Sequence, residues 1–331
     1  MESLTQLDTP SSITAYAETR IGGRSENQDS IGWQATPFGY LVTVCDGMGG
    51  GPGGKTASSI AVKEIIAGVT EAPKDEETTN ILIKAIRRAN MAIIEFAAEH
   101  PELSGMGSTC TVLLISENSA IVAHVGDSRV YQIRGKKKVF RTFDHSMVFE
   151  LVKKKVITEE QARLSQQSNV ITRALGAKPD VEVDCVELSF KKGDRFLLCT
   201  DGIHGSMPEE ELVALVSDNK SKLAAVTDGI ATKVDGDGRL NGGYHDNLTL
   251  AILETNVDST KCQTWKWESK KYITYGIAIV VIAIITAVIM LSVGKSSGEG
   301  KSSDSTGQND TTELNKKTDN TGQKNNNQNT Q

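Results

Sequence analysis

Four short apolar segments follow one another closely between residues 110 and 143, and they limit the possible folds more than any other feature. They are Cys110–Ile115, Ala120–Val125, Val130–Ile133 and Val139–Phe143. The links between them are rich in Gly, Ser, Asn, Asp and Lys and are far shorter than the roughly twelve residues that a parallel crossover needs. The segments are therefore expected to be strands that pair with antiparallel neighbours.

The rest of the N-terminal region mixes strands with helices. Further strands are expected at Tyr40–Cys45, Arg195–Cys199 and Leu248–Glu254. Helical periodicity is found at Lys55–Val69, Thr78–His100, Glu159–Gln167 and Glu209–Ser217. Antiparallel sheets with long helices outside them predict an α+β layered domain rather than a doubly wound one. Asp-Gly pairs at Asp228, Asp235 and Asp237 are interpreted as turns.

The C-terminal part of the chain has a different character. Tyr272–Val293 is a run of 22 uncharged residues, which as a helix would be about 33 Å long and would cross a hydrocarbon core of about 30 Å. A buried core helix is the alternative, but the run has no polar face. Residues 294–331 are polar and are expected to be disordered. This divides the chain into a folded domain at 1–255, a juxtamembrane linker at 256–271, a transmembrane helix at 272–293 and a polar tail at 294–331.

Charge and cysteine content predict where each part lies. Four lysines precede the apolar run and two follow it closely, namely Lys261, Lys266, Lys270 and Lys271 before it and Lys295 and Lys301 after it. The positive-inside rule then places the domain in the cytoplasm and the tail outside, in a single-pass cell-membrane protein. The five scattered cysteines indicate reduced thiols, and no secretory signal is visible at the N-terminus. A net charge of −6 gives no general reason to bind nucleic acid.

Several aspartates stand at the ends of expected strands. Asp46 and Asp201 each follow an apolar strand directly, and Asp246 comes just before another. Asp127 lies in a tight turn and Asp29 precedes a short apolar segment. Carboxylates held together repel one another unless cations bind, and hard oxygen ligands suit Mg²⁺ or Mn²⁺. The pattern predicts a divalent-metal site, with scattered surface aspartates as the alternative.

A second motif competes for the same strand end. Gly49–Thr56 satisfies the P-loop pattern G-x-x-x-x-G-K-[ST] between a strand and a helix, and Phe196–Asp201 resembles a Walker B strand. Against a P-loop NTPase, Asp46 would oppose a triphosphate, and the chain shows hairpins instead of alternating βα units. A nucleotide site would also leave the other aspartate segments unexplained. The NTPase remains an alternative at this level.

Eight short motifs, taken in order, resemble the metal-dependent protein phosphatases, the protein phosphatase 2C family in its bacterial membrane-anchored form. They are Gly22–Asp29, Val44–Gly50, Met106–Cys110, Val125–Arg129, Asp144–Ser146, Ile171–Gly176, Cys199–Gly202 and His245–Asn247. They extend over about residues 15–255. The resemblance implies a four-layer αββα sandwich, in which helices flank two antiparallel sheets and the metals lie between the sheets at one end.

The resemblance also implies a ligand set for two Mn²⁺ or Mg²⁺ ions. Asp46 would bridge both ions, Asp201 and Asp246 would complete one, and the Gly47 carbonyl would bind the other. Asp127, together with Asp201, would serve a weaker third ion. Two divalent ions lower the pKa of a water molecule, which would then attack phosphorus in line.

The family likeness assigns roles to two further catalytic residues and suggests the partners. Arg24 would bind the substrate phosphate, for which its planar fork is better suited than a lysine, and Asp29 would orient water. The expected activity is that of a protein serine/threonine phosphatase acting on phosphoproteins and reversing a bacterial Ser/Thr kinase. A catalytically weak module that only binds phosphoproteins is an alternative of a different class.

The chain departs from the family pattern at the general acid. Met48 stands where eukaryotic members carry a histidine, so the leaving oxygen must be protonated by another group. A metal-bound water is the first choice; His145 and His245 are candidates, with simple packing as their alternative role. Residues 146–170 resemble a mobile flap beside the active site.

Overall fold

The computed structural model describes residues 4–49 and 52–260. The chain divides into two units, Met1–Thr264 and Trp265–Gln331, and every described residue belongs to the first. Within the described ranges, no helix has both the length and the apolar character that a membrane crossing requires. The expected transmembrane helix at 272–293 and the tail at 294–331 lie outside the described residues.

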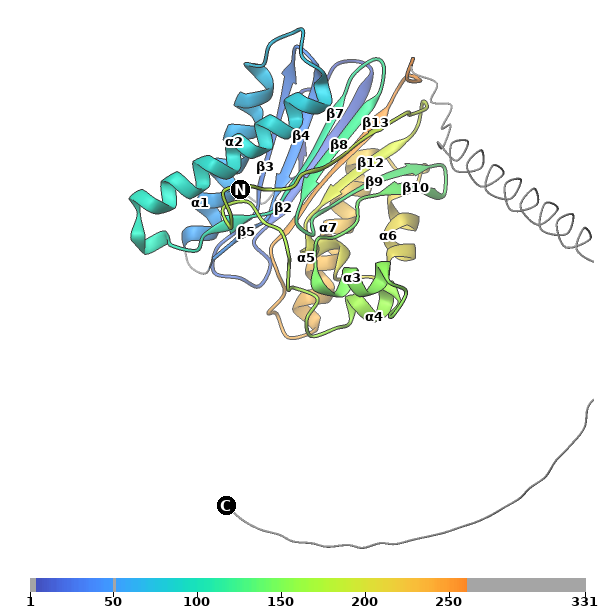
Figure 1. Cartoon of the computed structure of the whole chain (residues 1–331). Coiled ribbons are helices and arrows are strands. Elements are labelled where there is room, and N and C mark those ends of the chain that lie inside the picture. The colour runs from blue at the N-terminus through green and yellow to red at the C-terminus, as the bar shows by residue number, and fades with distance from the viewer. Residues whose placement is uncertain (1–3, 50–51, 261–331) are drawn as a thin grey trace, which may run out of the picture. The chain divides into compact units, whose positions relative to one another are not determined.

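Two antiparallel sheets form the centre of the domain (Figure 1). The larger sheet has the order β1 (Thr5–Gln6), β2 (Ile13–Arg20), β13 (Leu248–Thr255), β12 (Arg195–Cys199), β9 (Arg129–Arg134) and β10 (Lys137–Arg141). The second sheet has the order β11 (Asp184–Leu188), β8 (Ala120–Val125), β7 (Cys110–Ile115), β4 (Gly39–Cys45) and β3 (Ser30–Thr36). A two-residue pair, β5 (Gly47–Met48) with β6 (Gly107–Ser108), follows β4.

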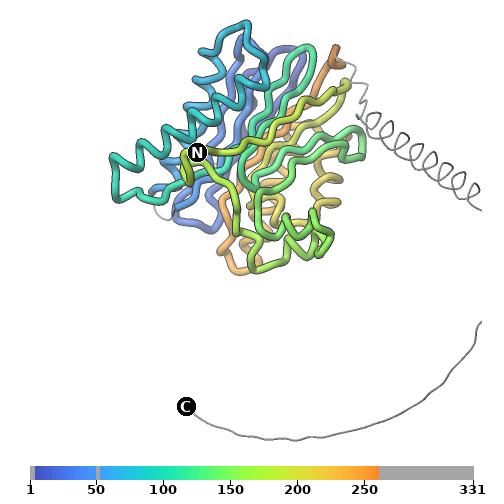
Figure 2. The backbone as a smooth tube through the Cα atoms, in the orientation of Figure 1, coloured from blue at the N-terminus to red at the C-terminus, as the bar shows by residue number. Residues whose placement is uncertain are grey.

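Helices cover the outer face of each sheet, and the path of the chain through the layers can be followed in Figure 2. The second sheet is covered by α1 (Pro52–Thr70) and α2 (Thr78–Glu99), which is followed by a short 3₁₀ turn, η1 (Pro101–Leu103). The larger sheet is covered by α5 (Asp201–His204), α6 (Glu209–Val216) and α7 (Leu223–Leu240). Two short helices, α3 (Met147–Lys153) and α4 (Glu159–Arg163), lie in the segment between β10 and β11. The expected αββα layering is confirmed.

Three apolar cores hold the four layers together. Along β12, Leu198 packs between the two sheets, whereas Leu197 packs under the helices of the larger sheet. Along β4, Val42 faces the other sheet and Leu41 faces α1 and α2. Successive strand residues point to opposite faces, so both faces of each strand are buried. This explains why these strands are continuously apolar in sequence.

Two expectations about local structure are wrong. β8 and β9 do not pair, because the link Gly126–Ser128 carries the chain from one sheet to the other. A short link requires only that the two strand ends be close, and here they lie in facing sheets. The Asp-Gly pairs at Asp228, Asp235 and Asp237 lie inside α7 and are not turns. Burial of its apolar side, which includes Val226 and Ile230, outweighs the low helix propensity of glycine.

Candidate active site

The expected metal ligands come together in one cleft at an end of the sandwich. The cleft has a volume of about 370 Å³ and is lined by Asp46, Asp127, Asp201 and Asp246. Asp46 follows β4, Asp201 begins α5 directly after β12, and Asp246 comes just before β13. Asp127 is brought there by the link that crosses between the sheets. Residues far apart in sequence thus present carboxylates to a shared space.

Hydrogen bonds hold Asp46 by its backbone. Its N–H donates to Thr109 Oγ1 at 2.9 Å, and its carbonyl oxygen accepts from the Thr109 N–H at 2.8 Å and from Ser108 Oγ at 3.0 Å. Thr109 also shares a 2.8 Å hydrogen bond with Ser128 Oγ, next to Asp127. The turn after β4 and the link between the sheets are therefore joined by hydroxyl groups.

The carboxylates disfavour one another's ionisation. Burial and the neighbouring acids raise the pKa of Asp29 to about 7 and that of Asp201 to about 6. Burial, followed by the charges of Asp29 and Asp201, raises the pKa of Asp46 well above its usual range. A buried group of acids that outnumbers the cations beside it fits divalent metal ions. No histidine or cysteine is among the described residues that line the cleft, so the oxygen donors fit Mg²⁺ or Mn²⁺ better than zinc.

Gly47 lines the cleft, whereas Asp29 is buried behind it and is not among the lining residues. The Asp29 carboxylate is buried and accepts a 3.0 Å hydrogen bond from Thr200 Oγ1, one residue before Asp201. Gly47 lines the cleft and is paired with Ser108. A side chain at Gly47 would collide with the Gly54 carbonyl group, so only glycine fits there.

Arg24 lies at the mouth of the cleft with a half-exposed side chain. Its Nη2 is 2.8 Å from Asp246 Oδ2. The loop that carries Arg24 is held by Asn247, whose Nδ2 donates to the Ile21 carbonyl at 2.7 Å and to the Glu26 carbonyl at 3.0 Å. This role of Asn247 was not predicted, because an amide with two remote backbone partners leaves no local pattern in the sequence.

The lysine of the P-loop pattern is used elsewhere. Lys55 Nζ donates to the Asp29 carbonyl at 2.7 Å and to Ser30 Oγ at 3.2 Å. Lys55 is also absent from the residues that line the cleft. An ammonium group held in this way is not available to bind a nucleotide phosphate, so the structure does not support a P-loop NTPase.

Neither histidine proposed as a general acid lines the cleft. His245 Nε2 lies 2.9 Å from Asp235 Oδ1 on α7. His145 is buried and contacts backbone groups. Met48 lines the cleft but carries no proton to donate.

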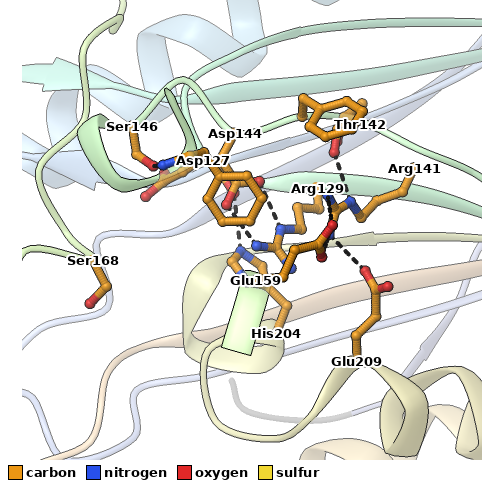
Figure 3. Close-up of polar contacts among 12 residues, drawn as sticks. Asp127, Arg129, Arg141, Thr142, Asp144, Ser146, Glu159, Ser168, His204 and Glu209 are labelled. Carbon is orange, nitrogen blue, oxygen red and sulfur yellow. Dashed lines mark hydrogen bonds and ion pairs between the residues drawn. The ribbon is translucent and has the colours of Figure 1, made fainter. Parts of the chain in front are cut away.

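A second cavity of about 230 Å³ adjoins the cleft beside α3 and α4, and shares Asp127, Asp201 and Asp246 with it. Figure 3 shows the polar contacts around it. Arg129 makes two 2.7 Å hydrogen bonds to the Asp144 carboxylate, and both side chains are almost fully buried. Arg141 bridges Glu159 of α4 and Glu209 of α6. His204 Nε2 is 3.0 Å from the Asp127 carbonyl oxygen, which further fixes the Asp127 turn.

A two-sheet sandwich with a carboxylate-lined cleft and an arginine at its mouth defines a metal-dependent hydrolase of phosphate esters. A family model described as Protein phosphatase 2C matches residues 18–227. The serine/threonine phosphatase stp of Listeria innocua is 34% identical over an alignment of 243 residues that covers 71% of this chain and 89% of that protein. The chain belongs to the protein phosphatase 2C family.

Solved structures agree with this assignment. The serine/threonine phosphatase Stp1 from Staphylococcus aureus is similar with a TM-score of 0.66 and 29% identity, covering 77% of this chain and 97% of that one. The catalytic domain of the serine/threonine phosphatase PstP, solved in complex with two manganese ions, gives a TM-score of 0.61 and 29% identity, covering 74% of this chain and 99% of that one. The protein is a metal-dependent protein serine/threonine phosphatase, and neither the P-loop NTPase nor the non-catalytic binding module is supported.

Proposed function

We propose that the domain hydrolyses phosphoserine and phosphothreonine in proteins with two divalent ions held in the cleft, Mn²⁺ or Mg²⁺. The observation that carries this proposal is the convergence of Asp46, Asp201 and Asp246 from remote parts of the chain, beside Arg24. Asp46, Asp201, Asp246 and the Gly47 carbonyl would hold the two ions. Asp127 and Asp201 would serve a third, weaker one.

The ions supply positive charge that acidifies water and neutralises the phosphoryl oxygens. The protein's own groups supply orientation. The Arg24 guanidinium binds two phosphate oxygens in a fixed plane and so directs the ester toward the carboxylates. Asp29, held by Thr200, accepts a hydrogen bond from water and orients it. Water would act as the nucleophile, so that no covalent phosphoenzyme is formed.

Activity that depends on both metal and these carboxylates would test the proposal. The full chain is expected to hydrolyse a phosphothreonine peptide and p-nitrophenyl phosphate with Mn²⁺ and to lose this activity with a chelator. Asp46→Asn and Asp201→Asn should reduce turnover at least a hundredfold. Asp237→Asn, an exposed aspartate of α7 that pairs with Lys233, is the matched control and should be unchanged. Capture of phosphopeptide without turnover would instead favour a binding module.

We also propose that residues 272–293 anchor the protein in the cell membrane, with the phosphatase domain in the cytoplasm and the tail at 294–331 outside. The support is the uncharged 22-residue run and the lysine bias. The partners would then be phosphorylated proteins near the membrane, together with a Ser/Thr kinase whose action the enzyme reverses. The full chain should stay in the membrane fraction after alkaline carbonate extraction, and release into the supernatant would contradict the anchor.

A further inference from the structure

His145 lies between residues 146–170, here called the flap, and the turn that carries Asp127; the flap base is the place where the two ends of the flap meet, beside Ile171 and Thr172. It lies between β10 and the first flap helix α3, is 2% exposed, and does not line the catalytic cleft. Its side chain therefore acts through the residues that it contacts rather than on the substrate.

One side of His145 binds both backbone groups of Gly126, the residue before Asp127. The His145 N–H donates to the Gly126 carbonyl at 3.0 Å, and the Gly126 N–H donates to His145 Nδ1 at 3.1 Å. Because a backbone N–H can only donate, Nδ1 must be the unprotonated nitrogen and Nε2 must carry the hydrogen. Gly126 has φ = 102°, a conformation that L side chains rarely adopt. The imidazole therefore fixes an unusual turn.

The other side of the ring faces a charged pair. His145 Nε2 is 3.3 Å from Asp184 Oδ2 on β11, and Arg173 donates to Asp184 Oδ1 at 2.8 Å. The ring also stacks on His124 with 4.5 Å between centroids. Burial, then His124 and Arg173, lower the pKa of His145 to about 4, so the ring is neutral at pH 7.

These groups could be taken for a metal site, since His124, His145 and Asp184 offer ligand atoms within 4.8 Å of one another. The contacts argue against it. Nδ1 of His145 already accepts from Gly126, and the Arg173 guanidinium lies 3.2 Å from Nε2. A metal ion at this position would be repelled by the positive charge of Arg173.

The backbone of His145 also joins the two ends of the flap. Its carbonyl accepts from the Thr172 N–H at 2.7 Å, Ser146 forms an isolated β-bridge with Ile171, and the Met147 N–H donates to the Val170 carbonyl at 2.9 Å. Ile171 and Asn169, at the returning end of the flap, line the catalytic cleft. One residue thus touches both the Asp127 turn and the flap base.

We propose that His145 is a positioning residue that couples the flap base to the Asp127 turn: its backbone carbonyl accepts from Thr172, and its Nδ1 accepts from Gly126. This proposal rests on the proposed function, because it assigns the flap to substrate binding and Asp127 to the weakest metal site. Loss of the Nδ1 contact should therefore loosen the flap base and the Asp127 turn together.

Two isosteric substitutions separate the two nitrogens of the ring. In His145→Asn the amide oxygen lies near the position of Nδ1 and can accept from Gly126, whereas in His145→Gln the amide nitrogen lies near Nε2 and the Gly126 contact is lost. We expect His145→Gln to weaken the weakest Mn²⁺ binding step about fivefold or more by calorimetry. Tryptic cleavage at the exposed flap lysines 153–155 should accelerate similarly, and the KM for a phosphopeptide should rise. His145→Asn should keep Mn²⁺ binding within about twofold of the unsubstituted chain.

The control is His124→Gln, which removes the stacked ring but keeps a donor for the Phe143 carbonyl, and it should leave Mn²⁺ binding and cleavage unchanged. If His145→Gln does not fold, His145→Leu, which also lacks an acceptor for the Gly126 N–H, takes its place and should shift cleavage and binding in the same direction. Asp184→Ala on the edge strand β11 removes only the Nε2 contact and, like His145→Asn, should leave Mn²⁺ binding within about twofold. Unchanged Mn²⁺ binding and cleavage in His145→Gln, or equal damage in His145→Asn, would overturn the inference. Absence of Mn²⁺ binding and hydrolysis in the unsubstituted chain would instead overturn the proposed function.

Discussion

Replacing Arg24 by lysine changes the shape of a cation while keeping its charge, and so tests how the phosphate is held. The Arg24 guanidinium can donate two parallel hydrogen bonds to a phosphate, whereas an ammonium acts as a point charge. A hydrogen bond to a charged group contributes about 1.5–3 kcal/mol. Because the Arg24 side chain is 54% exposed, solvent screens it and the lower end applies. At about 1.4 kcal/mol for a factor of ten, Arg24→Lys should lower kcat/KM roughly tenfold.

The assay is kcat/KM for a phosphothreonine peptide at saturating Mn²⁺, in which Arg24→Ala should lose more than Arg24→Lys. Arg88→Lys is the matched control, because Arg88 lies on α2 and pairs with Glu64 and Glu71 away from the cleft. Arg88→Lys should remain within twofold of the unsubstituted chain. If Arg24→Lys also remained within twofold, a planar two-point contact would be the wrong description of phosphate binding.

Three further perturbations follow from the same structure. Asp144→Ala leaves the buried Arg129 guanidinium without its carboxylate and should cost about 3–5 kcal/mol in urea unfolding; a loss below 1 kcal/mol would contradict this. The pKa values of Asp29 and Asp201 are raised to about 7 and about 6, so the stabilisation from their protonation is complete below about pH 4 and is lost as the pH rises through 6–7. The Tm of the metal-free protein should therefore fall between pH 5 and pH 8. Saturating Mn²⁺ should make the Tm depend less on pH. A metal-free Tm that does not change with pH would contradict the raised pKa values of these acids. ATP should not raise the Tm of the unsubstituted chain, and an ATP-dependent rise abolished by Lys55→Met would revive the P-loop interpretation.

Of the strands between residues 110 and 143, β7, β8 and β9 were predictable because their apolar runs are buried on both faces, whereas β10 is a largely exposed edge strand. β7 and β8 have the expected bounds, and β9 and β10 differ by one or two residues at their ends. The short links did not reveal that Gly126–Ser128 passes between sheets, since a link of that length fits a hairpin or a crossing equally well. β2 and β11 were missed, as was α7, whose Asp-Gly pairs suggest turns until its apolar side is seen to pack on the larger sheet.

The site was predictable where a carboxylate stands at a strand end. Asp46, Asp201 and Asp246 are marked by the apolar runs beside them, and they do meet in one cleft. Thr109 and Asn247 could not be found in this way. Their roles depend on partners that are remote in sequence, such as Asp46 for Thr109.

The most direct test of the central claim is calorimetric titration of the metal-free full chain with Mn²⁺, compared with Asp46→Asn. If the gathered carboxylates bind the catalytic ions, the unsubstituted chain should bind at least two Mn²⁺ per molecule, with proton release that is larger at pH 6 than at pH 8. The variant should lose the tightest of these binding steps. Equal stoichiometry and affinity in the two proteins would contradict the claim that Asp46 and its neighbours hold the metals.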